Sequence, residues 1–165
     1  MQVVGYTRVS TEDQARDGVS LSAQQAKLEA YALVKDWTLR RVIRDEGYSA
    51  KHLKRPGLEA LLALVTSRQV EAVLVYTLDR LTRSVADLDK LIKLFDRHEV
   101  ALVSLQESLD ATTATGRLMM NLLASVSQWE REVIGERTSD ALQHTSRPRA
   151  SGIATPSMTT PRASP

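Results

Sequence analysis

Residues 72–95 read AVLVYTLDRLTRSVADLDKLIKLF, and this stretch decides the class of fold. It opens with Ala72–Tyr76, a short and largely apolar run that predicts a buried strand. Ser84 and Asp87 then form a capping box, which marks the start of a helix, and apolar residues follow at helical spacing. Val100–Leu105 predicts the next strand. The order strand, helix, strand is typical of a parallel sheet with helices packed on it.

The same alternation extends toward the N-terminus. Two further strands are predicted at Gln2–Tyr6 and Leu39–Ile43. The helix between them is expected to begin at a capping box formed by Ser22 and Gln25, and a short helix follows near Leu58–Val65. We therefore expect an α/β domain with a mainly parallel sheet of four to five strands flanked by helices.

Two polar segments, Thr11–Gly18 and Arg44–Gly57, are predicted to be loops because glycine or proline interrupts them. A long helix is predicted at about 116–142, apolar in its first half and charged in its second. Such a helix either leaves the domain to meet a partner or packs on its own sheet. Residues 145–165 are dense in Ser, Thr and Pro, so we expect residues 1–144 to form one domain and 145–165 to be a disordered tail.

Composition excludes several kinds of site. The chain has no cysteine, so a disulfide, a thiolate nucleophile and a cysteine-based zinc site are impossible. His52, His98 and His144 are isolated, which predicts no metal site, and no glycine-rich nucleotide loop is present. The net charge of +2 permits a nucleic-acid partner without requiring one. With no signal peptide and no spanning segment expected, we predict a cytoplasmic protein without a membrane partner.

Tyr6, Arg8 and Ser10 alternate where the first predicted strand ends. Alternation places all three side chains on one face if the strand persists, with the serine hydroxyl exposed and the arginine beside it. That pair could bind and attack a phosphate, because a guanidinium forms paired hydrogen bonds with phosphate oxygens. The ordinary alternative is a surface serine and arginine at a strand end.

Leu78–Ser84 follows the third predicted strand, and in an open α/β sheet the site forms at the carboxyl ends of strands. Arg80 and Arg83 would share one side of a helical turn, and Asp79 could orient an arginine or transfer a proton. A solvated charged turn is the alternative here, as a solvated helix with ion pairs is for Trp129–Arg137. In combination, these residues favour a phosphate-directed site.

Three motifs together resemble the resolvase–invertase family of serine recombinases. They are GYTRVST at 5–11, LDRLTRS at 78–84, and QWERE with GERT at 128–138. The resemblance extends from about Val3 to Leu142. It implies a recombinase of a mobile genetic element, such as a resolvase or DNA invertase, whose long helix serves dimerisation. It also implies a double-stranded DNA partner, a homodimer that becomes a tetramer in the synaptic complex, and no cofactor or metal.

The resemblance also assigns roles to residues. Ser10 matches the nucleophile that attacks the scissile phosphate and becomes linked to the 5′ end of the DNA. Asp79 matches an acidic residue that assists proton transfer to the leaving 3′ oxygen. The arginines around the phosphate are matched by Arg8, Arg80, Arg83 and Arg131. Polar residues expected to support the site or bind DNA are Tyr6, Gln14, Gln24, Arg55 and Glu130.

The resemblance is weakest at the C-terminus. Family members continue into a DNA-binding region, whereas nothing after Thr145 has the apolar positions of a helix-turn-helix, so we expect a shortened product. One alternative to a recombinase is therefore a non-catalytic interaction protein that pairs with a full-length recombinase and inhibits it. Another alternative is a small-molecule phosphoesterase that uses the same serine.

Overall fold

The computed structural model describes residues 1–10, 19–50, 52–123 and 125–126. They include a five-stranded sheet with the order β2-β1-β3-β4-β5. The first four strands are parallel, and β5 pairs antiparallel with β4. The strands are β1 (Gln2–Val9), β2 (Thr38–Glu46), β3 (Ala72–Val75), β4 (Ala101–Ser104) and β5 (Leu109–Asp110). The predicted α/β class and mainly parallel sheet are confirmed.

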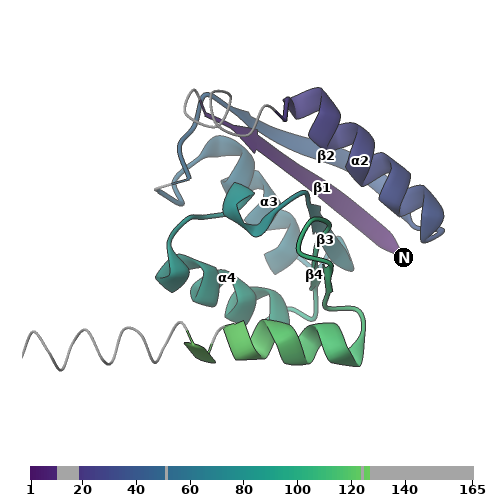
Figure 1. Cartoon of the computed structure of the whole chain (residues 1–165), viewed down its shortest axis with the longest axis vertical. Helices are drawn as coiled ribbons and strands as arrows, with labels where there is room; N and C mark the ends of the chain where they lie inside the picture. Colours follow the sequence, from purple (N-terminus) through teal and green to yellow (C-terminus); the bar gives the residue numbers. More distant parts are fainter. Residues whose placement is uncertain (11–18, 51, 124, 127–165) are drawn as a thin grey trace, which may run out of the picture. The chain divides into compact units, whose positions relative to one another are not determined.

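Helices cover both faces of the sheet (Figure 1). They are α2 (Leu21–Val34), α3 (Pro56–Thr66) and α4 (Val85–Arg97), with a short 3-10 turn, η1 (Leu78–Arg80). Alternate residues of β3 point to opposite faces. Ala72 and Leu74 pack with Leu28 of α2, whereas Val73 and Val75 belong to a larger core built with α3 and α4.

The first two strands are longer than their apolar runs predicted. β1 continues to Val9 rather than ending at Tyr6, and β2 continues to Glu46 through residues that were predicted to form a loop. After a register shift between Val3 and Val4, their parallel pairing continues without interruption to the last pair, Val9 with Glu46. The backbone pairing between these two strands therefore overrides the polar character of the sequence at their ends.

The two predicted capping boxes had different outcomes. Ser84 caps α4 as predicted, because its hydroxyl accepts a hydrogen bond from the backbone N–H of Asp87 at 3.2 Å. The prediction of a cap at Ser22 was wrong. The cap and the helix start lie two residues earlier: the helix begins at Leu21, and Ser20 has the extended backbone of a cap and accepts from the N–H of Ala23 at 3.1 Å.

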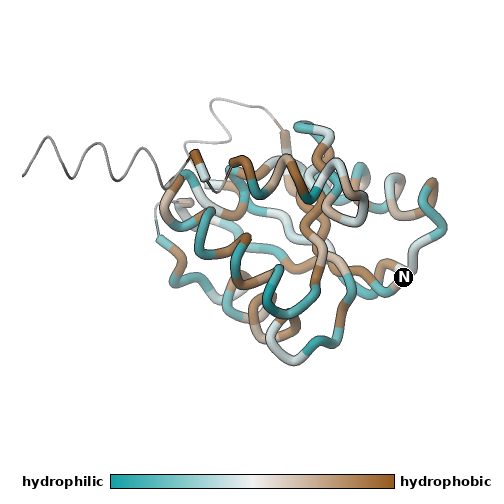
Figure 2. The backbone as a smooth tube through the Cα atoms, turned by 90° about the horizontal axis from the view of Figure 1, so that it is seen from below, coloured by the Kyte–Doolittle hydropathy of each residue, from teal (hydrophilic) through white to brown (hydrophobic). Residues whose placement is uncertain are grey.

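The described part of the predicted long helix comprises residues 114–123 and 125–126. Met120 packs into the larger core, while the other large apolar residues of this segment lie on its exposed surface. Hydrophobic and hydrophilic residues alternate along the helices that cover the sheet, as Figure 2 shows. The rest of the predicted helix and the predicted tail at 145–165 lie outside the described residues.

The unequal lengths of β1 and β3 create the place for a site. β3 pairs with β1 only as far as Tyr6, opposite Val75, whereas β1 continues for Thr7, Arg8 and Val9. The chain that leaves β3 turns at η1 and contacts this free length of β1. Residues separated by about seventy positions in the sequence therefore meet at the carboxyl end of the sheet.

Candidate active site

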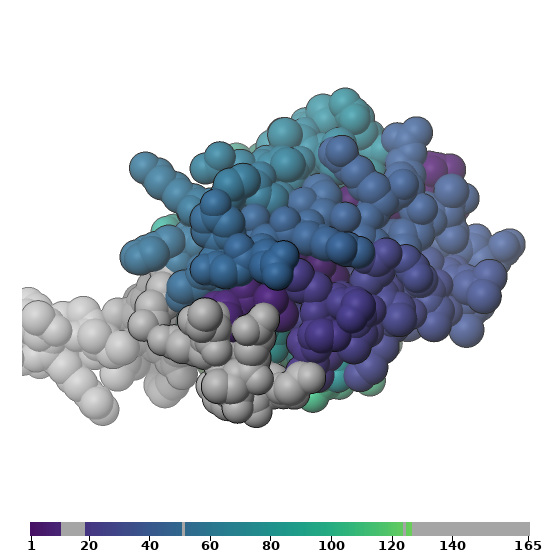
Figure 3. All heavy atoms as spheres, turned by 90° about the horizontal axis from the view of Figure 1, so that it is seen from above, coloured from purple at the N-terminus to yellow at the C-terminus, as the bar shows by residue number. Residues whose placement is uncertain are grey.

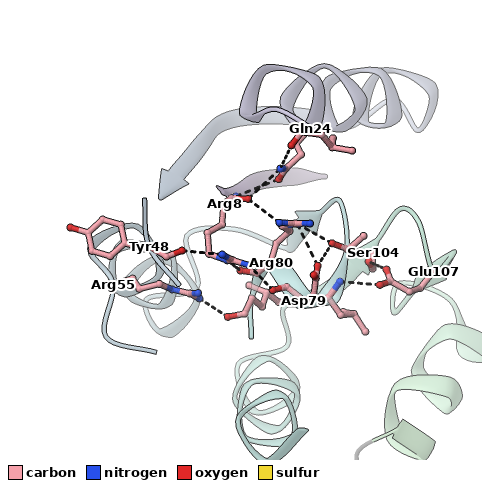
Figure 4. A network of polar contacts seen from close by, with 12 residues as sticks. Arg8, Gln24, Tyr48, Arg55, Asp79, Arg80, Ser104 and Glu107 are labelled. Carbon is pink, nitrogen blue, oxygen red and sulfur yellow. Dashed lines mark hydrogen bonds and ion pairs between the residues drawn. The ribbon is translucent and has the colours of Figure 1, made fainter. Parts of the chain in front are cut away.

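Arg8 lies at the centre of a buried polar cluster at the carboxyl end of β1. Its side chain is inaccessible to solvent, and its guanidinium donates hydrogen bonds to three backbone carbonyls. Nε reaches the carbonyl of Arg80 at 3.1 Å, Nη2 that of Asp79 at 3.1 Å, and Nη1 that of Tyr48 at 2.9 Å. A buried guanidinium needs such acceptors, so Arg8 ties β1 to η1 and to the chain that follows β2 (Figure 4).

The side chain of Arg80 in turn contacts the backbone of Arg8. Its residue exposure is 2%, and its Nη1 donates to the carbonyl oxygen of Arg8 at 3.4 Å. Its Nε lies 3.2 Å from the hydroxyl oxygen of Thr77 and 3.4 Å from a carboxylate oxygen of Asp79. The two arginines predicted from separate motifs are thus brought together, and Asp79 partly balances their charge.

Ser10 follows two residues after Arg8, and its predicted exposure was wrong. Only 6% of the residue is accessible. The preceding residue, Val9, is still paired with Glu46 of β2. Gly47 also donates its backbone N–H to the carbonyl of Val9 at 2.9 Å. All residues of β1 after Gln2 are buried, and Figure 3 shows some purple N-terminal atoms between the dark blue atoms of α2 and the lighter blue atoms that follow in the sequence.

Gln24 connects α2 to the same end of β1. Its side-chain oxygen accepts from the backbone N–H of Arg8 at 3.4 Å, and its amide nitrogen donates to the carbonyl of Arg8 at 3.2 Å. The same nitrogen donates to the carbonyl of Val19 at 3.2 Å. Gln24 is fully buried, so the predicted supporting residue holds the backbone around Arg8.

Tyr6 and Arg55 also lie beside Arg8, in a buried network with Asp45. The hydroxyl of Tyr6 donates to Asp45 Oδ2 at 2.7 Å, and Arg55 Nε lies 3.8 Å from the same oxygen. Burial raises the pKa of the Tyr6 hydroxyl far above its ordinary value, although the charge of Arg55 opposes the change. Burial likewise lowers the pKa of Arg55. In this structure, therefore, both predicted supporting residues contact the buried carboxylate of Asp45.

Asp45 itself was missed by the sequence analysis. Its carboxylate accepts the backbone N–H groups of Gly57 at 2.8 Å and Leu58 at 3.0 Å, which open α3. Residue 57 must be glycine for this approach, because a Cβ there would lie 2.7 Å from Asp45 Oδ1. The available signal was its position two residues after the predicted strand Leu39–Ile43, where an α/β sheet places its site. In the structure it lies opposite Arg8 in the sheet.

The remaining predicted residues divide into two groups. Arg83 follows η1 and is partly exposed, and its backbone N–H reaches the carbonyl of Ala50 at 3.4 Å. The side chain of Asp79 is also partly exposed, at 32%. Three predicted site residues lie outside the described residues, namely Gln14, Glu130 and Arg131.

Comparison with known proteins identifies the family of this chain. The family described as "Resolvase, N terminal domain" matches residues 3–148. The chain belongs to the resolvase family of serine recombinases. The transposon Tn917 resolvase of Enterococcus faecalis is 34% identical over 141 residues, which cover 86% of this chain and 69% of that protein. The transposon Tn552 resolvase of Staphylococcus aureus is 35% identical over 138 residues, covering 82% of this chain and 63% of that protein.

The same relation is seen in solved structures. The N-terminal catalytic domain of TP901-1 integrase superposes with a TM-score of 0.73 at 35% identity, covering 81% of this chain and 98% of that domain. The chain is thus similar to a serine recombinase catalytic domain over most of its length. Within the described part of this recombinase domain, no helix is long and apolar enough to cross a membrane. The described residues also include no group of three or more His, Asp or Glu side chains placed to hold a metal ion.

Proposed function

We propose that this chain is the catalytic domain of a site-specific DNA recombinase and that Ser10 is its nucleophile. The observation that supports this proposal best is the meeting of Arg8 and Arg80 at the carboxyl end of β1, the strand that Ser10 directly follows. Two guanidinium groups next to a serine suit a phosphodiester, because they offset the charge that builds up on the phosphate oxygens during attack.

The reaction has two balanced halves. In the first, Ser10 Oγ forms a bond to the scissile phosphorus, the bond from phosphorus to the 3′ oxygen breaks, and the serine proton is transferred so that a 3′ hydroxyl leaves. In the second, a 3′ hydroxyl of the exchanged strand attacks the phosphoserine, the new phosphodiester forms and the serine hydroxyl is restored. The phosphoserine link preserves the energy of the broken bond.

We assign the surrounding residues from their matches to the family motifs. Arg8, Arg80 and Arg83 neutralise the phosphate, with Arg131 as a further arginine. Asp79 assists proton transfer to the leaving oxygen, and its contact of 3.4 Å with Arg80 keeps it beside the reacting group. The supporting residues expected around them are Tyr6, Gln14, Gln24, Arg55 and Glu130.

The enclosed state of the cluster adds a requirement. Arg8 and Ser10 are almost inaccessible, so a phosphodiester reaches them only after the enclosing residues move. Among the three described arginines of the set, Arg83 is the partly exposed one, so it could provide a first contact for DNA. We therefore propose that binding of double-stranded DNA precedes opening of the site.

We further propose that two copies of the chain dimerise through the helical residues 114–123 and 125–126, referred to below as segment 114–126, and that two dimers form the synaptic tetramer. The exposed apolar side chains of this segment lie along one stripe, because they recur at intervals of three or four residues. They are Leu118, Met119, Leu122, Leu123 and Val126. A second copy presents the same stripe, so the contact is self-complementary.

A covalent adduct tests the nucleophile. We expect the chain to become linked to a DNA duplex with a nick opposite the cleavage position, which traps the intermediate and yields a band of reduced mobility on a denaturing gel. Ser10→Ala should abolish the band, whereas Ser22→Ala, which removes an exposed hydroxyl from α2, should retain it. An adduct formed by Ser10→Ala would show that another residue is the nucleophile.

A further inference from the structure

The turn η1 carries Asp79 and Arg80. The residue that precedes this turn, Thr77, has the extended backbone of a cap but does not cap it with its side chain. Its hydroxyl instead donates to the carboxylate of Asp79 and accepts from Arg80 Nε at 3.2 Å. The backbone N–H of Leu78 is accepted from outside the turn, by Glu107 Oε1 at 3.2 Å.

Glu107 comes from the connection between β4 and β5, and this connection is itself fixed. The backbone N–H groups of Leu105 and Gln106 donate to the carbonyls of Val75 at 3.1 Å and Tyr76 at 3.0 Å, at the end of β3. The hydroxyl of Ser104, the last residue of β4, donates to Glu107 Oε2. Both carboxylate oxygens are thus engaged, one by the end of the strand and one by the start of the turn (Figure 4).

We propose that Glu107 is a positioning residue of the recombination site, acting through η1. This inference rests on the proposed function, since it concerns the same site. A carboxylate at the start of a helical turn is favourable because the N–H groups there are unpaired and carry partial positive charge. Glu107 fixes the start of η1, and the carbonyls of Asp79 and Arg80 that follow are the acceptors of the Arg8 guanidinium.

The chain of contacts predicts what Glu107 does and what it does not do. It sets the position of Asp79, Arg80 and Arg8 relative to Ser10 without touching the phosphate. Its loss should therefore slow the covalent step and leave DNA affinity unchanged. Small displacements of reacting groups have large effects on rate, so we expect Glu107→Ala to form the adduct roughly tenfold to a hundredfold more slowly.

The experiment compares three variants with the wild-type chain on the same nicked duplex. Glu107→Gln keeps the oxygen that accepts from Leu78, so it should recover most of the rate that Glu107→Ala loses. Gln106→Ala removes the exposed neighbouring side chain of the same connection and should react at the wild-type rate. DNA affinity should be equal in all four proteins. A wild-type rate for Glu107→Ala, or a rate for Glu107→Gln as low as that of Glu107→Ala, would overturn the positioning role.

A second measurement does not depend on activity. In nitrogen-15 NMR spectra of the full chain, Glu107→Ala should speed hydrogen exchange at the Leu78 amide and shift the Nε–H signal of Arg80, and Glu107→Gln should largely restore both. If the wild-type chain formed no adduct, the proposed function would fail, and these spectra alone would decide whether Glu107 positions the turn. Unchanged signals in Glu107→Ala would overturn the inference.

Discussion

The guanidinium of Arg8 stabilises the protein's own backbone in the structure described here. It donates to the carbonyls of Tyr48, Asp79 and Arg80, so it joins β1 to two other segments, the chain after β2 and η1. A lysine has a single ammonium group and lacks the planar fork that permits these divergent bonds. The residue type at position 8 is therefore required by the fold as well as by the proposed chemistry.

Asp45 contributes to the stability of the same buried cluster. We expect Asp45→Ala to destabilise the domain by about 3–5 kcal/mol, because it leaves the buried Arg55 without its counter-charge. The substitution also removes the acceptor for the two amides that open α3. Urea unfolding followed by circular dichroism measures the change in the free energy of unfolding.

The adjacent Glu46→Ala is the matched control, since Glu46 is exposed on the same strand, and it should stay within about 0.5 kcal/mol of wild type. Asp45→Asn keeps the shape of the side chain and should give an intermediate loss. Equal stabilities of Asp45→Ala and Glu46→Ala would contradict the structural role assigned to Asp45.

Sequence patterns located these residues only in part. The positions of Arg8 and Arg80 after two parallel strands predicted that they would meet, because the carboxyl ends of such strands share one edge. The direction of their guanidinium groups was not predictable, since the acceptors are main-chain carbonyls, which every residue has. Asp45 was missed because the strand that carries it loses its apolar pattern after Ile43.

At the scale of elements, Asp110 of β5 ties the sheet edge to the end of α2. Lys35 Nζ lies 3.0 Å from Asp110 Oδ2, and the hydroxyl of Tyr31 donates to the same oxygen at 3.2 Å. Partial burial alone would raise the pKa of Asp110. Hydrogen bonds from Thr112 and Lys35, together with the charge of Lys35, outweigh that effect and hold the pKa below its ordinary value.

A depressed pKa makes this tie sensitive to acid. The folded state binds the Asp110 proton less readily than the unfolded chain, so the stabilisation is complete well above pH 4 and is lost as the pH falls below about 4. Asp110→Asn should therefore show a smaller fall in urea midpoint between pH 6 and pH 3 than the wild-type chain. This pH interval spans the ordinary titration of an Asp carboxyl. Asp96→Asn on α4, where the carboxylate is exposed, should behave like wild type. Equal falls in urea midpoint between pH 6 and pH 3 for Asp110→Asn and Asp96→Asn would contradict this prediction.

At the scale of the whole molecule, the helical segment 114–126 carries the proposed dimer contact. Leu118 and Leu122 are 66% and 56% exposed, respectively. In sedimentation velocity we expect the wild-type chain to be a dimer at micromolar concentration and Leu122→Glu to shift it to monomer, because a charge in an apolar contact is costly. Leu33→Glu on α2, at a residue that is 81% exposed, should leave the dimer intact. A wild-type monomer over the whole concentration range would exclude this contact.

The overall order of elements could be predicted because the apolar runs of the chain are well separated. Their exact lengths depended on pairing between distant segments, which single-sequence patterns do not contain. β5 is the clearest case, since Leu109–Asp110 is too short to show any alternation and forms only because Val103 and Ser104 offer a free edge.

That short fifth strand has a consequence for how the protein behaves at high concentration. An open sheet edge invites pairing with a foreign strand, which leads to aggregation. Here one edge strand, β5, has only two residues, of which Asp110 is paired with Lys35, and the opposite edge strand, β2, displays the positive charges of Arg40, Arg41 and Arg44. Both margins therefore resist the growth of intermolecular sheets. Sheet growth would therefore not compete with the helical dimer contact that we propose.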